Sequence, residues 1–325
     1  MSRFSVIKLS GLTPTHIGTG RESYDFSSSC LHSDTISAAL ASIMALQGKA
    51  DGIEHFLSSF RISSAFPFYR DHLFMPVPHG RINVSITGKE ESNIRKSLKK
   101  IRYMEYPLWQ RMICGEHITV EHSQINGECL MSSTSLIPDE IYKSEVSERV
   151  CVPRGDGQDS EPFYFEWKYF KKEAGLFVLT DATGDILDQV LDNFQLLGQQ
   201  GIGTDKSIGG GKFSVSLSGE MEIIPPEKPS GVMLLSLYLP SKSDIETIDL
   251  DSSSYSIILR GGYMAGSSYE KIRHLRKRSL YMFDTGSVFI TSNMLDGRIE
   301  DLRPEWNDSD MHPAYRNGRP LQIPI

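Results

Sequence analysis

The residues best suited to binding chemistry lie in one glycine-rich stretch, 201–212, which reads GIGTDKSIGGGK. A glycine inside a helix or strand costs about 0.5–1 kcal/mol relative to alanine, so the stretch is predicted to be a loop that uses positive φ and close backbone approach. A lysine beside exposed N–H groups is typical of an anion site. We therefore expect this loop to hold phosphate groups, with a plain surface loop as the alternative. The candidate binding residues are Gly201, Gly203, Thr204, Lys206, Ser207, Gly209, Gly210, Gly211 and Lys212.

Two common nucleotide-binding motifs do not fit this loop. A P-loop needs Ser or Thr after its Gly-Lys pair, but Phe213 follows Lys212. The dinucleotide-binding fingerprint needs glycine at its sixth position, where this chain has Lys206. A nucleotide-binding enzyme is therefore the least favoured of the functions considered.

The elements around the loop must position it. Residues 175–180 form an apolar run typical of a buried strand. Leu187, Val190, Leu191, Phe194 and Leu197 follow with helical spacing, and Thr183 or Asp185 can cap the start of that helix. Residues 212–217 alternate as in a strand, so we expect a strand–helix–loop–strand unit.

This arrangement resembles the glycine-rich loop of the RAMP superfamily of CRISPR proteins. Three further stretches resemble segments of the fourth-subunit family of type III-A (Csm) effector complexes. They are the helix start at 31–40, the late segment at 278–289 that contains Asp284-Thr285-Gly286, and the tail at 312–320. The resemblance spans nearly the whole chain and depends on all four stretches occurring in order.

The resemblance implies an α+β fold of two ferredoxin-like halves. Residues 1–222 would be the first half, residues 222–229 a proline-rich linker, and residues 230–325 the second half. A thumb hairpin is expected at about 141–170, because two strand-like arms flank a polar glycine-rich tip. In RAMP proteins such a hairpin presses on guide RNA, which gives that role to Arg154, with Arg149 in reserve. An exposed surface hairpin is the alternative.

The segment after the first strand, 3–9, lies near the glycine-rich loop in this superfamily and touches RNA. The resemblance therefore adds His16, Ile17, Gly18 and Arg21 to the RNA-binding residues. A simple loop histidine is the alternative for His16.

The function implied is that of a non-catalytic RNA-binding subunit in antiviral defence. It would bind the repeat-derived 5′ handle of the CRISPR RNA. It would also bridge a large polymerase-like subunit and the backbone RAMP subunits within a hetero-oligomeric ribonucleoprotein, with no catalytic residue, cofactor or metal of its own. The alternative is a metal-independent endoribonuclease that processes precursor CRISPR RNA with His16 as general acid–base. A variant of that alternative would use Asp25 to cleave target RNA.

Composition fits a protein that carries out this role in the cytoplasm. The net charge of −7 argues against general nucleic-acid affinity and leaves room for a local basic groove. No run is long enough for a membrane span, no export signal is evident, and Cys30, Cys114, Cys129 and Cys151 read as reduced thiols. The basic segments 94–102 and 271–278 suit either phosphates or an acidic partner. Ser33 or Asp34 is expected to cap a helix that ends near Gly48.

Overall fold

The structure is a computed structural model. It describes residues 1–18, 24–80, 82–88, 91–133, 140–152, 160–264, 267, 269–304 and 311–325, and for 91–95 it describes the backbone alone. In this part of the chain no helix combines the length and the apolar character that crossing a membrane requires.

The first half is built on four antiparallel strands in the order β12-β1-β11-β2. In chain order these elements make a βαββαβ unit, with other elements inserted between the second and third of these strands. The unit consists of β1 (Ser2–Ser10), α1 (Ser33–Leu46), β2 (Phe66–Tyr69), β11 (Ala174–Thr180), α5 (Gly184–Gln200) and β12 (Ser214–Ile223). The predicted strand–helix–loop–strand unit around the glycine-rich loop is confirmed.

Both faces of this sheet are buried, which explains the unbroken apolar run of β11. On β1, Ile7 and Leu9 pack with α1 and α5, whereas Phe4 and Val6 point to a second core on the opposite face. Strand side chains alternate between faces, so consecutive apolar residues serve two cores. The second core includes Met233 and other residues of the C-terminal half.

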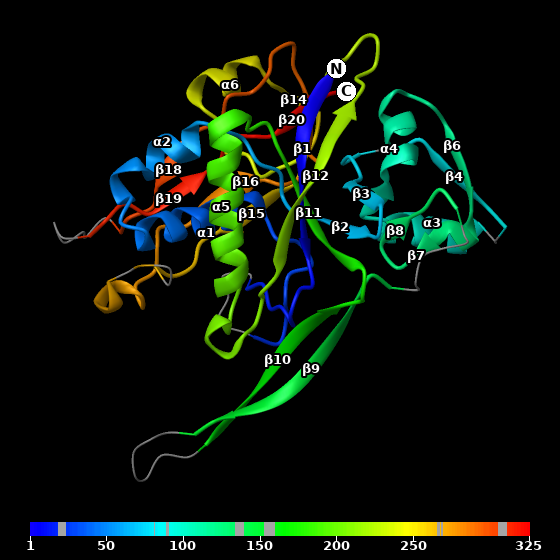
Figure 1. The fold of residues 1–325 in the computed structure, drawn as a ribbon. Helices are drawn as coiled ribbons and strands as arrows, with labels where there is room; N and C mark the ends of the chain where they lie inside the picture. The colour runs from blue at the N-terminus through cyan, green and yellow to red at the C-terminus, as the bar shows by residue number, and fades with distance from the viewer. Residues whose placement is uncertain are drawn as a thin grey trace.

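An inserted subdomain extends the same sheet to eight strands, in the order β12-β1-β11-β2-β3-β5-β8-β7. Helices α3 and α4 belong to this insertion (Figure 1). Two short elements, η1 (Ala50–Gly52) and α2 (Ile53–Ser58), follow α1. The elements between β2 and the hairpin are β3 (His72–Pro76), β4 (Val84–Thr87), α3 (Glu91–Lys100), β5 (Tyr103–Glu105), α4 (Tyr106–Ile113), β6 (Ile118–Glu121), η2 (His122–Gln124), β7 (Ile125–Asn126) and β8 (Cys129–Leu130).

A long antiparallel hairpin leaves the body of the molecule as a two-stranded arm (Figure 1). Its strands are β9 (Tyr142–Cys151) and β10 (Glu161–Phe170). The hairpin predicted at about 141–170 is therefore present. Its tip, which includes Arg154, lies outside the described residues.

The C-terminal half contains a four-stranded antiparallel sheet in the order β14-β17-β13-β20. This order repeats that of the first half, with a single helix, α6, between its first two strands and two-stranded ribbons elsewhere. The elements from the glycine-rich loop onward, apart from β12, are η3 (Lys206–Ile208), β13 (Gly231–Leu234), α6 (Lys242–Thr247), β14 (Asp249–Ser254), β15 (Ile257–Arg260), η4 (Glu270–Ile272), β16 (Leu280–Phe283), β17 (Val288–Ile290), β18 (Ile299–Asp301), β19 (Tyr315–Asn317) and β20 (Gln322–Pro324).

Candidate nucleic-acid interface

The glycine-rich loop is a compact turn between α5 and β12 rather than a loose connection. Gly201, Gly203, Gly209 and Gly211 all have positive φ, which side chains rarely tolerate. Asp205 also has positive φ and precedes the single 3-10 turn η3. The prediction that glycines supply this backbone geometry is confirmed.

Close approach explains two glycines in particular. A Cβ added at Gly211 would lie 1.9 Å from the carbonyl oxygen of Ile202, and one at Gly203 would lie 2.3 Å from that of His16. Gly210 has ordinary φ, but its added Cβ would lie 2.9 Å from the ring of Trp167. The loop is therefore folded back on itself and against two other segments of the chain.

Most N–H groups of the loop are satisfied internally. Within the loop and α5, Gly201 donates to the carbonyl oxygen of Leu197, Ile202 to that of Gly211, Ile208 and Gly210 to that of Asp205, and Gly209 to that of Lys206. In the segment after β1, the carbonyl oxygens of His16 and Pro14 accept from Thr204 and Gly211, and the Thr13 hydroxyl accepts from Lys212. The exposed N–H groups expected of this loop are therefore confined to a small part of it. Buried N–H groups need acceptors, and a tight loop provides them from within the chain. Among the described residues, the adjacent N–H groups of Lys206 and Ser207 have no protein acceptor.

The exposed part of the loop carries its charges. Lys206, Ser207 and Lys212 are exposed, whereas Gly201, Gly210 and Gly211 are buried. Desolvation lowers the pKa of the Lys206 ammonium, so a nearby anion would favour its charged form. The part of the loop open to phosphate is therefore the turn at 206–207 together with Lys212.

The segment 13–18 lies directly against the loop, as predicted, although its side chains do not face outward. His16 is fully buried; its Nδ1 lies 2.8 Å from the Glu166 carbonyl oxygen, and its ring packs on Phe165 with centroids 4.5 Å apart. Ile17 is also buried. Nonpolar and aromatic groups therefore enclose both side chains, and RNA binding by His16 and Ile17 stays a prediction. Gly18 remains beside Thr204, and Arg21 lies outside the described residues.

The outer half of the hairpin is fastened to the loop by Arg149, which pairs with Phe163 near the tip end of β9. Its guanidinium donates to the Asp205 carboxylate at 2.5 Å and lies over the rings of Phe165, at 4.0 Å, and Trp167, at 5.2 Å. The reserve residue of the sequence analysis is therefore tied to its own chain. We call the assembly of segment 13–18, loop 201–212 and Arg149, Phe165 and Trp167 the loop site. Asp205, Phe165 and Trp167 are members that the sequence did not single out, although Asp205 lies within the glycine-rich loop and both aromatic residues lie in the predicted hairpin.

Replacing Arg149 with lysine should loosen this fastening. Lysine keeps the charge but loses the planar group that stacks on an aromatic ring. The lost stacking corresponds to about 1–2 kcal/mol. Hydrogen exchange at the amides of 201–212 should become faster, while exchange in β11 stays unchanged. Unchanged exchange in the loop would show that Arg149 does not hold it.

Two of the other stretches that carried the resemblance, 31–40 and 312–320, meet Arg260 at a junction between the halves. Asp34 on α1 is fully buried and accepts two hydrogen bonds from Arg260, at 2.8 and 2.9 Å, and one from Arg316. Both guanidinium groups hold the pKa of this carboxyl far below its usual range, against the effect of burial. The N-cap of α1 is His32 and no side chain caps it, so the expected capping role of Ser33 or Asp34 is wrong. We call Asp34, Arg260 and Arg316 the buried triad.

The basic segment 271–278 is partly tied down. Arg273 donates to the Ser267 carbonyl oxygen at 2.8 Å, Arg276 to the Tyr263 hydroxyl at 3.1 Å, and Arg278 to the Arg303 carbonyl oxygen at 2.9 Å. These bonds join the segment to neighbouring loops of the C-terminal half. The segment is therefore less suited to being a continuous phosphate-binding stripe than its composition indicated.

The described residues contain no group of three or more His, Cys, Asp or Glu side chains placed to hold a metal ion. Cys30 and His32, which are two positions apart in the sequence, both line a cavity at the junction with the C-terminal half.

Comparison with known proteins places this geometry in a family context. Residues 227–325 match the family model described as the CRISPR Csm4 C-terminal domain. Csm4 of Mycobacterium tuberculosis is 26% identical over 82% of this chain and 80% of the relative. Csm4 of Thermococcus onnurineus is 25% identical over 78% of this chain and 83% of the relative.

Solved structures share the fold over the whole chain. A Csm1–Csm4 cassette in complex with cA4 gives a TM-score of 0.62 at 18% identity, covering 100% of this chain and 98% of the matched chain. A Csm3–Csm4 subcomplex of the type III-A CRISPR-Cas interference complex gives 0.61 at 16% identity, covering 100% and 99%. Residues 227–325 thus resemble a Csm4 C-terminal domain, and the whole chain is similar to Csm4 proteins in sequence and in fold.

Proposed function

We propose that this chain is a non-catalytic RNA-binding subunit of a type III-A CRISPR complex and holds the 5′ handle of the guide RNA at the loop site. The observation that carries the proposal is the turn at 206–207. It combines an exposed lysine, beside the exposed Lys212, with two adjacent N–H groups that have no acceptor among the described residues. Adjacent backbone N–H groups in such a turn suit a phosphate oxygen.

The same loop site suits single-stranded RNA rather than duplex. Bases of single strands stack on aromatic side chains, and backbone phosphates contact cations and N–H groups. Tyr24 lies beside the loop site, stacks on Phe165 at 5.8 Å and is 45% exposed, so one of its faces is available. We infer that the first half and the C-terminal half are ferredoxin-like, on the basis of their shared strand order, and that the β9–β10 arm acts as the thumb.

The partners are proposed from the relatives. The Csm4 proteins of similar fold occur in assemblies with Csm1 and with Csm3. We infer that this subunit likewise joins a Csm1-type large subunit to Csm3-type backbone subunits, within a ribonucleoprotein of the cytoplasm.

The absence of catalysis is also part of the proposal. A general acid–base at a 2′-hydroxyl must reach the substrate directly or through one water. His16 is enclosed by Phe165 and by the backbone of Glu166, which favours the binding role over the endoribonuclease.

The test measures binding of the full chain to an RNA that carries the repeat-derived handle, over a range of salt concentrations. For single strands each phosphate contact contributes about 0.7 to the slope of log K against log salt. The double variant Lys206→Gln, Lys212→Gln should reduce that slope by about 1.4. Lys171→Gln, Lys172→Gln, which removes two exposed lysines outside the loop site, should leave the slope unchanged. Equal slopes for the two double variants would contradict RNA binding at this turn.

A further inference from the structure

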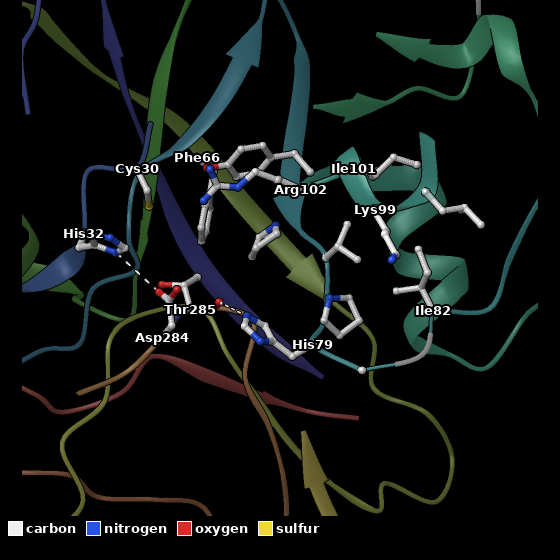
Figure 2. A pocket seen from close by; sticks show the side chains of 16 residues that line it. Cys30, His32, Phe66, His79, Ile82, Lys99, Ile101, Arg102, Asp284 and Thr285 are labelled. Carbon is white, nitrogen blue, oxygen red and sulfur yellow. Dashed lines mark hydrogen bonds and ion pairs between the residues drawn. The ribbon is translucent and has the colours of Figure 1, made fainter. Parts of the chain in front are cut away.

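A cavity of about 400 Å³ lies between the insertion, the segment before α1 and the C-terminal half (Figure 2). It is separate from the loop site and shares no lining residue with it. Two of the stretches that resemble the family contribute to its lining without taking part in the proposed function: 31–40 through His32, and 278–289 through Asp284 and Thr285. Its volume lies within the range of small-molecule sites.

One wall of the cavity is fixed by contacts between the halves. The His79 N–H donates to the Gly286 carbonyl oxygen at 2.7 Å, and its Nε2 lies 3.1 Å from the Thr285 carbonyl oxygen. A Cβ on Gly286 would approach the Val77 carbonyl oxygen to 2.8 Å. The wall is therefore closely packed, and the cavity is preformed.

The floor offers an acceptor and a nitrogen that lacks a partner. Asp284 Oδ1 lies 3.9 Å from His32 Nδ1, and that enclosed nitrogen makes no hydrogen bond within the described chain. Burial, with the nearby Arg260, lowers the pKa of His32 to about 4, so the imidazole is neutral at physiological pH. A ligand that carries both a donor and an acceptor on one edge would satisfy the pair, and Figure 2 shows the two side chains facing one another.

The rest of the lining is cationic and apolar. Lys99, from the last turn of α3, and Arg102 supply positive charge. Ile82, Leu98 and Ile101 line the apolar side. A simple inorganic anion would leave the apolar side unfilled. A fatty acyl chain would leave His32 Nδ1 without a partner and place hydrocarbon against the Asp284 carboxylate, which accepts from the Thr285 N–H at 2.7 Å, and both are costly.

We propose that this cavity binds a nucleotide, with the base against the apolar wall, its polar edge on Asp284 and His32, and its phosphate at Lys99 and Arg102. The nucleotide is either free in solution or one unit of an RNA strand. The chemistry is the same in the two cases, and it does not depend on RNA binding at the loop site.

The experiment titrates the full chain with each of the four ribonucleoside monophosphates, and separately with the handle RNA, by calorimetry. Loss of one charge-assisted phosphate contact should weaken binding about tenfold in Lys99→Gln. Lys100→Gln, one residue further along the helix and outside the lining, should change affinity by no more than about twofold. Asp284→Asn adds a donor to the floor and should reorder the preference among the four bases, which a purely structural effect would not do.

The two arms identify the source of the nucleotide. Saturable binding of a monophosphate that Lys99→Gln weakens assigns a free ligand, and an effect confined to the RNA arm assigns a unit of the strand. The cavity proposal is overturned if neither arm responds to Lys99→Gln or Asp284→Asn. Gly211→Ala, which alters the loop site alone, should leave monophosphate binding intact, so the two proposals can fail separately.

Discussion

Gly211→Ala should weaken binding of the handle RNA by about tenfold or more. The added Cβ would lie 1.9 Å from the Ile202 carbonyl oxygen, and the residue has a φ of +67°. The backbone must shift to relieve that overlap, which breaks the Ile202 and Gly211 hydrogen bonds and displaces the turn at 206–207. Gel-shift or fluorescence-anisotropy titration measures the loss.

Gly209→Ala is the matched control. It has a φ of +92°, yet an added Cβ there meets nothing within 4 Å. Alanine at this position costs about 1 kcal/mol of backbone strain, but its Cβ does not overlap a neighbouring atom. The variant should therefore lose no more than about fivefold in affinity for the RNA. If the two variants bound RNA equally well, and both were folded by circular dichroism, the shape of this loop would not govern RNA binding.

Asp34→Asn should lower the free energy of unfolding by about 3–5 kcal/mol. The carboxylate is fully buried between Arg260 and Arg316, and removal of one charge leaves two buried cations without compensation. Because the triad joins α1 to β15 and β19, both halves should lose stability together. Chemical denaturation followed by fluorescence measures this difference, with Asp188→Asn on the exposed side of α5 as the control.

The stabilising effect of Asp34 should depend on pH in a defined direction. Its folded-state pKa is depressed, so its contribution is present above the unfolded value of about 3.9 and declines as the pH falls below that value. The stability difference between the native chain and Asp34→Asn should therefore be constant near neutral pH and shrink in acid. A difference that grew as the pH fell would contradict the buried, ionised carboxylate.

Local patterns in the sequence predicted local structure well. The apolar spacing of Val190, Phe194 and Leu197 corresponds to the buried face of α5. The glycine spacing in 201–211 predicted positive φ, because that requirement is set within the loop itself. The two arms of the hairpin were recognisable because strand-like residues flank turn residues.

What the sequence could not show depends on contacts between distant residues. Asp34 reads as a helix cap until Arg260 and Arg316, more than 200 positions away, are brought to it. His16 reads as an exposed loop histidine until β10 covers it. In the sequence the loop N–H groups look available for a ligand. In the structure Thr13, Pro14 and His16, from the segment after β1, supply hydrogen-bond acceptors for three of them. The extent of each half stays a prediction from composition and resemblance.

The most direct test of the account is to tag the protein in its own host, purify it under native conditions, and sequence the RNA and proteins that accompany it. The account predicts short guide RNAs that share a 5′ repeat remnant, together with Csm1-type and Csm3-type subunits. It also predicts that Gly211→Ala retains fewer of those guides than Gly209→Ala. Recovery of the protein without guide RNA and without either partner would contradict an assembly subunit that holds the handle.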